Sequence, residues 1–516
     1  MREPVFKVYE QRQGMLLPPS YEEMVPENHP VRVVDEVIER IDLGALERTY
    51  KGGGTSSYNP RLLLKVMVYA YLRNVYSSRK IEESLNENIH FMWLAGGAKP
   101  DHNTISDFRS KRLKNHLKGI FNEVVMLLAE SGAVSLREIK LDGTKIEANA
   151  NRYTFIWGKS VKRRREQIAS QLKELWAYVE QVYKDEEQQP NTPDFTKIDP
   201  EAVRRTVEEI NEALKEKEVA PKIKQKLAYA KKNYPAKAAE YDAQEKMLAG
   251  RNSCSKTDVD ATFMRMKEDH LGNGQLKPAY NVQASTNDHY ILGYTLTQSA
   301  GDTLSLPGHI DEFERGYGCR PESVTADAGY GSEANYDYLE ERGITAYVKY
   351  ALFNKEQNDR KHQTNAFHAD NLYYNEQTDT YTCPSGQPMT YIGLAERTSV
   401  GGHQKQPRMY QAANCRGCPM RGPCHAAEGN RTIQRNANLI RHRKKIKKLL
   451  TSEEGIEKRR QRYEVEAVFG NIKQNKGFRR FMLRGLEKVT IETGLIALAH
   501  NLKRLSRANE IGRAHV

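Results

Sequence analysis

The sequence predicts an α/β protein with a mixed sheet, preceded by an all-helical region. Residues 61–76 indicate the helical region, because their apolar side chains recur at helical spacing behind Pro60, a residue suited to a first helical turn. Alternating apolar and polar residues at 135–151 and 279–299 indicate strands, and 323–350 has a strand–helix–strand pattern. In order, these segments give strand, hairpin, helix, strand, helix and strand, which is the plan of a sheet with mixed strand directions.

The region from residue 1 to about 125 is expected to be helical. One predicted helix starts at a serine cap and stops at Gly96-Gly97, and another runs from a cap at Asn103 or Thr104 to Gly132. This order of helix, short helix, polar turn and helix is compatible with helix-turn-helix DNA binding. It is equally compatible with an ordinary helical bundle.

Composition indicates a soluble protein with a polyanionic partner. The 516-residue chain has a formal net charge of +13, a pI near 9.2 and a mean hydropathy of -0.75. It has no run near the roughly 20 apolar residues of a membrane span and no signal peptide, so a cytosolic protein is expected. The charge favours DNA or RNA as a partner. Six cysteines are too few for a disulfide framework.

Two aspartates lie in or after predicted strands. Asp327 ends a strand and precedes Ala-Gly-Tyr-Gly, at the kind of strand end where catalytic groups collect in α/β sheets. An aspartate before a glycine turn is also ordinary turn chemistry. Asp142 lies within IKLDGTKI, where Asp-Gly could form either part of a strand or a plain hairpin turn.

A third carboxylate, Glu466, lies in a basic helix. Arg462, Glu466, Phe469 and Lys473 are spaced so that they share one helix face, which is poorly suited to pure core packing. An exposed ladder of ion pairs is the ordinary alternative for such a face. Glu464 is the nearest competitor of Glu466, and only the spacing separates the two.

The segment around Glu466 resembles the Y-x2-R-x3-E-x6-K signature of DDE transposases from bacterial insertion sequences. Arg462, Glu466 and Lys473 match the R, E and K, whereas Arg459 stands at the tyrosine position and Tyr463 follows the arginine. The resemblance covers nearly the whole chain and includes the segments LDGTKIEANAN, TADAGYGSEANY, PAYNVQAS, SKTDVDATFMRMK, VFGNIKQNKGFRRFMLRGLEKV and the N-terminal PDHNTISDFR.

This resemblance implies an RNase H-like catalytic core with Asp142, Asp327 and Glu466 as its catalytic residues. The three carboxylates would hold two Mg²⁺ or Mn²⁺ ions, which suit oxygen ligands and in-line displacement at phosphorus. The implied reaction is cleavage at the transposon ends followed by attack of the freed 3′-OH on target DNA. The implied partners are terminal inverted repeats, target DNA and further copies of the chain, as a homodimer or larger, in the bacterial cytoplasm at the nucleoid.

Basic residues around Glu466 are expected to contact DNA. Lys473 would lie near a terminal phosphate, and Arg462 would orient a carboxylate or hold DNA. The residues expected to follow the phosphate backbone are Lys476, Arg479, Arg480 and Arg484. The segment 439–450 is either a further DNA-contacting helix or a solvated basic helix.

Four cysteines cluster before this helix and predict a structural zinc site. They are Cys383, Cys415, Cys418 and Cys424, and four thiolates would leave no open position for catalysis. His425 could replace Cys424, and His403 is a further candidate ligand. Unligated, reduced cysteines are the alternative.

The predicted domains follow from these patterns. The charge-rich segment broken near Pro190 and Pro193 is expected to be a solvated helical hairpin inserted into the core. The expected boundaries are 1–130 for the helical, possibly DNA-binding domain, 131–158 and 251–371 for the core, 159–250 for the helical insertion, 372–430 for the cysteine-rich insertion, 431–510 for the part carrying Glu466, and 511–516 for a non-native tail resembling an adapter-encoded peptide.

Two other functions compete with transposition. A catalytically inactive or domesticated transposase-derived protein would use the basic helices and cysteines only to bind DNA. A host nuclease would share the core without transferring strands. Retention of all three carboxylates favours the active transposase.

Overall fold

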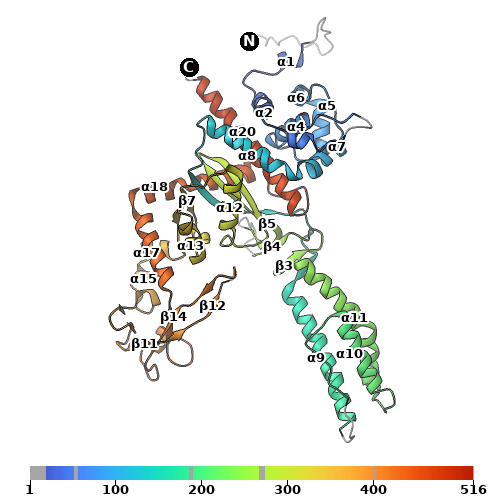
Figure 1. The fold of residues 1–516 in the computed structure, drawn as a ribbon, viewed down its shortest axis with the longest axis vertical. Helices are drawn as coiled ribbons and strands as arrows, with labels where there is room; N and C mark the ends of the chain where they lie inside the picture. The colour runs from blue at the N-terminus through green and yellow to red at the C-terminus, as the bar shows by residue number, and fades with distance from the viewer. Residues whose placement is uncertain (1–18, 52–55, 185–189, 267–273, 400, 515–516) are drawn as a thin grey trace, which may run out of the picture. The chain divides into compact units, whose positions relative to one another are not determined.

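The computed structural model describes residues 19–51, 56–184, 190–266, 274–399 and 401–514. The chain forms two compact units, each built from separated stretches of sequence. Residues 1–135, 470–478 and 491–516 make up the first unit, and residues 136–469 and 479–490 make up the second. The mixture of helices and sheets confirms the predicted α/β class (Figure 1).

The first unit is helical in its described residues. Its elements are α1 (Tyr21–Met24), α2 (Pro30–Glu39), α3 (Gly44–Glu47), α4 (Pro60–Leu72), α5 (Ser78–Glu87), α6 (Ile89–Leu94), α7 (His102–Asp107), η1 (Phe108–Arg112), η2 (Leu113–Asn115), α8 (Leu117–Glu130), η5 (Asn471–Asn475) and most of α20 (Leu486–Ala514). Pro60 occupies the first turn of α4, as predicted, and α4 is buried along most of its length. The predicted non-native tail falls partly on α20, while residues 515 and 516 lie outside the described part.

Side-chain caps divide this unit more finely than the sequence predicted. The helix expected to run to Gly96 is two helices, because Asn88 ends α5 and its side chain accepts from the backbone N–H of His90 to begin α6. The next helix is capped by Asp101, rather than Asn103 or Thr104, and it ends after Asp107. A π-helical and a 3₁₀ segment then precede α8.

The second unit is built around a six-stranded mixed sheet. Its strands are β1 (Glu138–Glu147), β4 (Thr262–Arg265), β5 (Leu276–Asn287), β6 (Tyr290–Thr297), β7 (Ser323–Ala326) and β8 (Thr345–Val348). The order is β4-β5-β1-β7-β8, with β6 also paired to β5. β5 is antiparallel to β1 and β6, whereas β7 is parallel to β1 and β8. The turn between β5 and β6 places Asp288 and His289 at positive φ, as a tight hairpin requires.

Helices lie between these strands and follow the last of them, β8. They are α12 (Ser305–Tyr317), η3 (Ala328–Tyr330), α13 (Glu333–Glu341), α14 (Phe353–Asn358), α15 (Arg360–Gln363), η4 (Ala369–Asn371), α17 (Ala437–Thr451), α18 (Glu453–Gln461) and α19 (Tyr463–Gly470). Ser332 caps α13 and Gly343 follows it at positive φ, so the predicted start and stop of this helix are confirmed.

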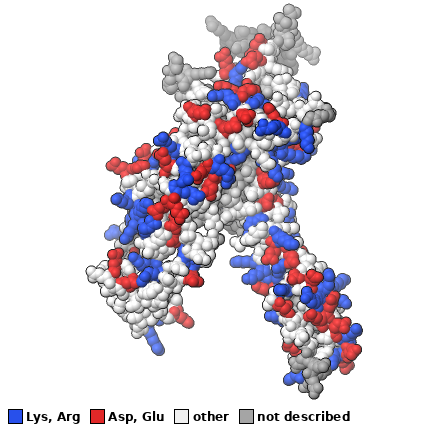
Figure 2. All heavy atoms as spheres, viewed as in Figure 1, with Lys and Arg blue, Asp and Glu red and all other residues white. Residues whose placement is uncertain are grey.

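The charged segment after β1 is three helices rather than a simple hairpin. After β2 (Phe155–Trp157), the chain forms α9 (Gly158–Val182), α10 (Pro200–Ala213) and α11 (Pro221–Leu248), and returns through β3 (Ser253–Ser255). The three helices enclose a hydrophobic cluster of their own that includes Leu172, Trp176 and Ile210. Their outer faces carry interspersed acidic and basic side chains (Figure 2). The segment therefore has one helix more than the expected hairpin. Its apolar residues at helical spacing form the core, although charged residues dominate the composition.

The cysteine-bearing segment forms a small sheet of its own. The strands are β9 (Tyr374–Asn375), β10 (Thr380–Thr382), β11 (Pro388–Leu394), β14 (Arg408–Ala412) and β15 (Thr432–Arg435), in the order β15-β14-β11-β10-β9. A separate hairpin pairs β12 (Arg397–Thr398) with β13 (Gln404–Lys405), and α16 (Arg421–Cys424) precedes β15. Tyr381, Met389 and Tyr410 fill the core of this sheet.

Candidate catalytic site

Asp142 and Asp327 lie beside each other on neighbouring parallel strands. The pairing of β1 with β7 extends to Leu141 and Ala326, which are the residues immediately before the two aspartates. Neighbouring strands are about 4.8 Å apart, so the two aspartates lie at one level of the sheet. Asp142 pairs with Ala284 of β5 inside the sheet, so the Asp-Gly hairpin considered for this position is wrong.

Each aspartate is oriented by the backbone that follows it. The backbone N–H of Gly143 donates to Oδ1 of Asp142 at 2.9 Å, and the N–H of Ala328 donates to Oδ1 of Asp327 at 2.6 Å. Asp142 is 6 % exposed, whereas Asp327 is half-buried. Each carboxylate therefore accepts a hydrogen bond from the backbone that helps to hold it in place.

Glu466 extends from α19 and is tied to Arg462. Nη2 of Arg462 donates to Oε1 of Glu466 at 2.7 Å, and Nη1 of the same guanidinium lies 3.8 Å from Oδ2 of Asp142. The side chain of Glu466 is 46 % exposed, whereas that of Arg462 is 7 % exposed. The (i, i+4) relation predicted for Arg462 and Glu466 is therefore present, and the arginine also links Glu466 to the strand that carries Asp142.

The three carboxylates all affect the pKa of the Arg462 guanidinium. Burial lowers the pKa of its guanidinium, but the charges of Asp327 and Asp142 and the hydrogen bond to Glu466 outweigh burial and hold the pKa above its usual range. Nε and Nη1 are buried and make no hydrogen bond within the described residues. Buried guanidinium groups of this kind are held by nearby negative charge, which the three carboxylates supply.

Glu464, the competitor of Glu466, is engaged elsewhere. Its Oε2 lies 3.4 Å from Nζ of Lys140, and its Oε1 accepts from the hydroxyl of Thr286 at 2.7 Å. The side chains of Glu464 and Lys140 are 9 % and 5 % exposed. Glu464 therefore joins α19 to β1 and β5 through a buried ion pair, which sequence spacing alone did not reveal.

The basic residues expected to contact DNA have different environments. Arg479, Arg480 and Arg484 are exposed, and Arg484 donates to the backbone oxygen of Asn149 at 2.7 Å. Lys473 and Lys476, which belong to the first unit, are 7 % and 2 % exposed. Their burial differs from the exposed position that the sequence predicted, because η5 has a π-helical backbone that ends the regular helix spacing.

Several basic side chains of α17 form ion pairs within the second unit. Arg441 and Lys445 both pair with Glu340, and Lys447 pairs with Glu356. The hydrogen bonds from Arg441 and Lys445 lower the pKa of Glu340 to about 2. α17 is therefore a basic helix whose charges are partly paired within the second unit, rather than fully solvated.

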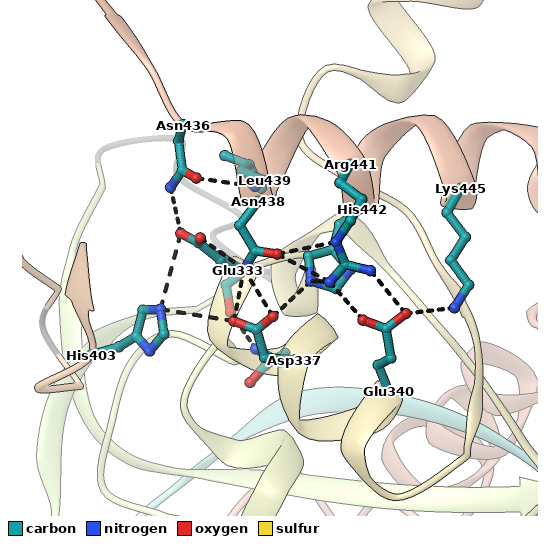
Figure 3. A network of polar contacts seen from close by, with 12 residues as sticks. Glu333, Asp337, Glu340, His403, Asn436, Asn438, Leu439, Arg441, His442 and Lys445 are labelled. Atoms are coloured by element: carbon teal, nitrogen blue, oxygen red, sulfur yellow. Dashed lines mark hydrogen bonds and ion pairs between the residues drawn. The ribbon is translucent and has the colours of Figure 1, made fainter. Parts of the chain in front are cut away.

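A polar cluster joins α13, α17 and the β12–β13 hairpin (Figure 3). Among the described residues, the one group of three or more His, Cys, Asp or Glu side chains with ligand atoms within 4.8 Å of one another is Glu333, Asp337 and His403. Asn436 and Asn438 already donate to these carboxylates, and Nζ of Lys405 lies 3.3 Å from Glu333. The cluster therefore connects the cysteine-bearing segment to the core through hydrogen bonds and ion pairs.

The four cysteines and His425 line one small pocket. Cys383, Cys415, Cys418 and Cys424 all border it, and none of the four forms a disulfide. The backbone N–H and a guanidinium N–H of Arg431 donate to Cys415 and Cys424 at 3.3 and 2.9 Å. His403, the further zinc ligand considered, lies instead in the polar cluster with Glu333.

The pKa of Cys383 also favours its thiolate. Burial raises this pKa, but hydrogen bonds involving Ser385 and the backbone, together with the charge of Arg431, lower it overall. A lowered thiol pKa is typical of cysteines that bind metal ions, but among the described residues no three of the ligand atoms of these cysteines and His425 lie within 4.8 Å of one another.

Two family comparisons identify the class of protein. Residues 382–506 match the family described as a transposase DDE domain, and residues 19–111 match one described as a transposase domain (DUF772). No curated protein and no solved structure matches the chain. The first match includes Glu466 and the four cysteines, whereas Asp142 and Asp327 precede it.

The two matches support a DDE transposase of insertion sequences, as the resemblance predicted. A DDE domain implies transposition activity on DNA and a general dependence on divalent metal ions. Within the described residues, no helix is both long enough and apolar enough to cross a membrane.

Proposed function

We propose that this transposase cuts the ends of its element and joins them to target DNA, with Asp142, Asp327 and Glu466 as the catalytic triad. The observation that carries the proposal is the pair of contacts made by Arg462, at 2.7 Å to Glu466 and 3.8 Å to Asp142. Through them, a helix late in the sequence lies beside the strand that carries the first aspartate. Asp327 stands at the same level on the next strand.

The strand arrangement supports an RNase H-like core. An antiparallel β6-β5-β1 set continues into the parallel strands β7 and β8. Asp142 lies on β1, and Asp327 directly follows the neighbouring strand β7. Catalytic groups in α/β sheets gather at the carboxyl ends of such strands. The proposed domain boundaries are those given by the sequence, except that residues 470–478 and 491–510 belong to the helical unit. The helical insertion and the cysteine-rich insertion interrupt the core.

The donor set of the triad fits Mg²⁺ or Mn²⁺. All three side chains offer carboxylate oxygens, which hard cations prefer as ligands. Bound at this site, two ions would activate the attacking oxygen and stabilise the leaving oxygen. Arg462 would orient Glu466, and its positive charge would be available to a phosphate.

The cysteine pocket is proposed to hold one structural Zn²⁺. Four sulfur donors border the pocket, which fits a closed zinc site, and His425 is a possible substitute for Cys424. Such an ion would stabilise the small sheet around Tyr410 and would take no part in catalysis.

Exposed cations that follow Glu466 in the sequence are the proposed DNA contacts. Arg479, Arg480 and Arg484 offer their side chains to solvent in the second unit. Lys473 and Lys476 would have to leave their buried positions to reach a phosphate. The proposed assembly is a homodimer or larger on paired ends, in the bacterial cytoplasm at the nucleoid.

A cleavage assay tests the triad. DNA carrying the element's own ends is incubated with Mg²⁺ and the parent chain or Asp142→Asn, Asp327→Asn or Glu466→Gln. Each variant should lose cleavage and keep most of its DNA binding, measured by gel shift. Glu457→Gln, which changes an exposed glutamate of α18, and Asp311→Asn on α12 are the matched controls. Near-normal cleavage by a triad variant would remove that residue from the site.

The same assay tests the competing DNA-binding function. If the parent chain binds the ends and cuts nothing with either Mg²⁺ or Mn²⁺, the chain acts as a DNA-binding protein derived from a transposase. Cleavage without joining to target DNA would instead favour a nuclease.

A further inference from the structure

A fourth carboxylate, Asp302, lies next to the two aspartates of the sheet. It belongs to the connection between β6 and α12, where the sequence offers no periodic pattern. A Cβ atom added to Gly143 would lie 2.6 Å from Oδ1 of Asp302, and one added to Gly329 would lie 3.6 Å from its Oδ2. Gly143 follows Asp142, and Gly329 lies two residues after Asp327. Asp302 therefore approaches the backbone beside both aspartates.

Two buried amides of β5 hold this carboxylate. Nδ2 of Asn281 and Nε2 of Gln283 donate to Oδ1 of Asp302 at 2.7 and 3.0 Å. Asn281 and Gln283 are 1 % and 0 % exposed, and Oδ1 of Asn281 has no hydrogen-bond partner among the described residues. These amides are the polar positions of the segment PAYNVQAS, to which the triad gives no role.

The same network reaches the turn that carries Asp327. The hydroxyl of Tyr330 donates to Oε1 of Gln283, and the hydroxyl of Thr303 donates to the backbone oxygen of Gly329 at 2.8 Å. Nδ2 of Asn335 donates to the backbone oxygens of Thr303 and Tyr330 at 2.8 and 2.7 Å. The loop of Asp302 is thus bonded to β5 on one side and to the Asp327 turn on the other.

Charge also couples these residues. Burial, followed by the negative charges of Asp302, Asp142 and Asp327, raises the pKa of Tyr330 well above its usual range. The phenol therefore stays protonated and remains a donor to Gln283. Asp302 makes no ion pair with a cation in the described residues, so its charge adds to that of the two aspartates.

We propose that Asp302 is a positioning residue of the catalytic site, which fixes Asp142 and Asp327 relative to each other and adds negative charge beside them. This inference rests on the proposed catalytic role of the two aspartates. Gly143 and Gly329 permit the close approach, since a side chain at Gly143 would collide with Asp302 and Gln283. Asn281, Gln283 and Tyr330 orient the carboxylate. The consequence is stronger binding of a divalent cation by Asp142 and Asp327.

Binding of Mn²⁺ to the full chain without DNA tests this role independently of catalysis. Free Mn²⁺ is measured by electron paramagnetic resonance for the parent chain, Asp302→Asn, Asp142→Asn and Asp311→Asn. Replacing a residue that orients metal ligands typically lowers metal affinity 10- to 100-fold. Asp302→Asn should therefore raise the half-saturating Mn²⁺ concentration about tenfold. Asp311→Asn on α12 removes a carboxylate bonded to Tyr338 and Arg342 and should leave binding unchanged.

A Mg²⁺ titration of DNA cleavage separates positioning from a general structural effect. Asp302→Asn should need more Mg²⁺ for half-maximal cleavage and should recover part of its rate at high Mg²⁺. A purely structural residue would lower the maximal rate without shifting the midpoint, and that result would overturn the proposal. If Asp302→Asn does not fold, Asn281→Leu provides the test instead. This variant removes one of the two hydrogen-bond donors to Asp302, so it should weaken Mn²⁺ binding by a smaller factor.

The two proposals fail in different ways. If Asp142→Asn loses Mn²⁺ binding while Asp302→Asn binds like the parent chain, Asp302 has no positioning role and the triad stands. If Asp142→Asn itself binds Mn²⁺ like the parent chain and cleaves normally, the triad is wrong and the role of Asp302 falls with it.

Discussion

Glu464 and Lys140 form a buried ion pair between α19 and β1, with 3.4 Å between their charged atoms. Two residues further along the same helix, Glu466 is 46 % exposed and bonded to Arg462. The two glutamates therefore differ in burial and in partner, although they lie in one short stretch of sequence. Their difference gives the first prediction.

Glu464→Gln should destabilise the fold, whereas Glu466→Gln should abolish cleavage with little loss of stability. Removing one partner of a buried pair leaves the other charge unpaired and costs about 3 kcal/mol. The measurement is urea unfolding of each variant beside its cleavage rate. Lys140→Met combined with Glu464→Gln should recover part of the lost stability, and equal stability of the two single variants would contradict the assignment.

Replacing Arg462 by lysine should lower cleavage by about 100-fold, since small displacements of catalytic groups have effects of that order. An ammonium group cannot reach Asp142 and Glu466 together as the planar guanidinium does. The rate is measured on transposon-end DNA at saturating Mg²⁺. Arg460→Lys, on the adjoining helix α18, is the control and should keep the parent rate. If Arg462→Lys cleaves DNA at the rate of the parent chain, cleavage does not require a side chain that contacts both Asp142 and Glu466.

One Zn²⁺ per chain is expected in the purified protein. Elemental analysis measures it, and Cys415→Ser or Cys418→Ser should remove it because each takes away one of four sulfur donors. Cys319→Ser changes an exposed cysteine outside the pocket and should leave the zinc content unchanged. A parent chain free of zinc after purification in zinc-containing buffer would leave the cysteines as reduced, unligated thiols.

Lys476 should make the stability of the first unit depend on pH. Burial, with the charges of Lys503 and Arg507, lowers the pKa of Lys476 from 10.5 to about 7. The folded state therefore loses this proton at lower pH than the unfolded state does. Between these two values the unfolded state binds more protons, so the free energy of unfolding rises with pH, by up to about 1.4 kcal/mol per pH unit.

Lys476→Met tests this dependence through urea unfolding at several pH values. The variant should be more stable than the parent chain, most clearly below pH 7, and the difference should disappear above about pH 10.5. Lys99→Met replaces an exposed lysine of the same unit and should show no such trend. A constant difference at every pH would mean that Lys476 is charged in the folded state.

Much of the sheet could be predicted from the sequence because its signals are local. Alternation defines β1, β5 and β6, and the Ser332 cap and Gly343 stop define α13. The third helix of the charged insertion could not be predicted as readily, since charged residues outnumber the apolar ones that form its core. The π-helical η5, which buries Lys473, also leaves no recognisable pattern.

The candidate site likewise contains residues that the sequence indicated and residues that only the structure revealed. Spacing placed Arg462 and Glu466 on one helix face and a strand end drew attention to Asp327, but the resemblance to DDE transposases is what singled out Asp142, Asp327 and Glu466 as catalytic. The ion pair of Glu464 with Lys140 and the amides around Asp302 depend on contacts between distant segments. A single sequence carries no local signal for such contacts, because strand pairing and side-chain direction decide them.

The first unit draws its residues from both ends of the chain. Tyr71 of α4 donates from its hydroxyl to Glu492 of α20 at 3.0 Å, and Tyr76 donates to the backbone oxygen of Lys476 at 2.6 Å. Glu466 of the second unit likewise comes long after Asp142. A ribosome that stops early would release a product with neither a complete helical unit nor a complete triad. With the proposed triad, interrupted synthesis would therefore yield fragments that lack a complete site for DNA cleavage.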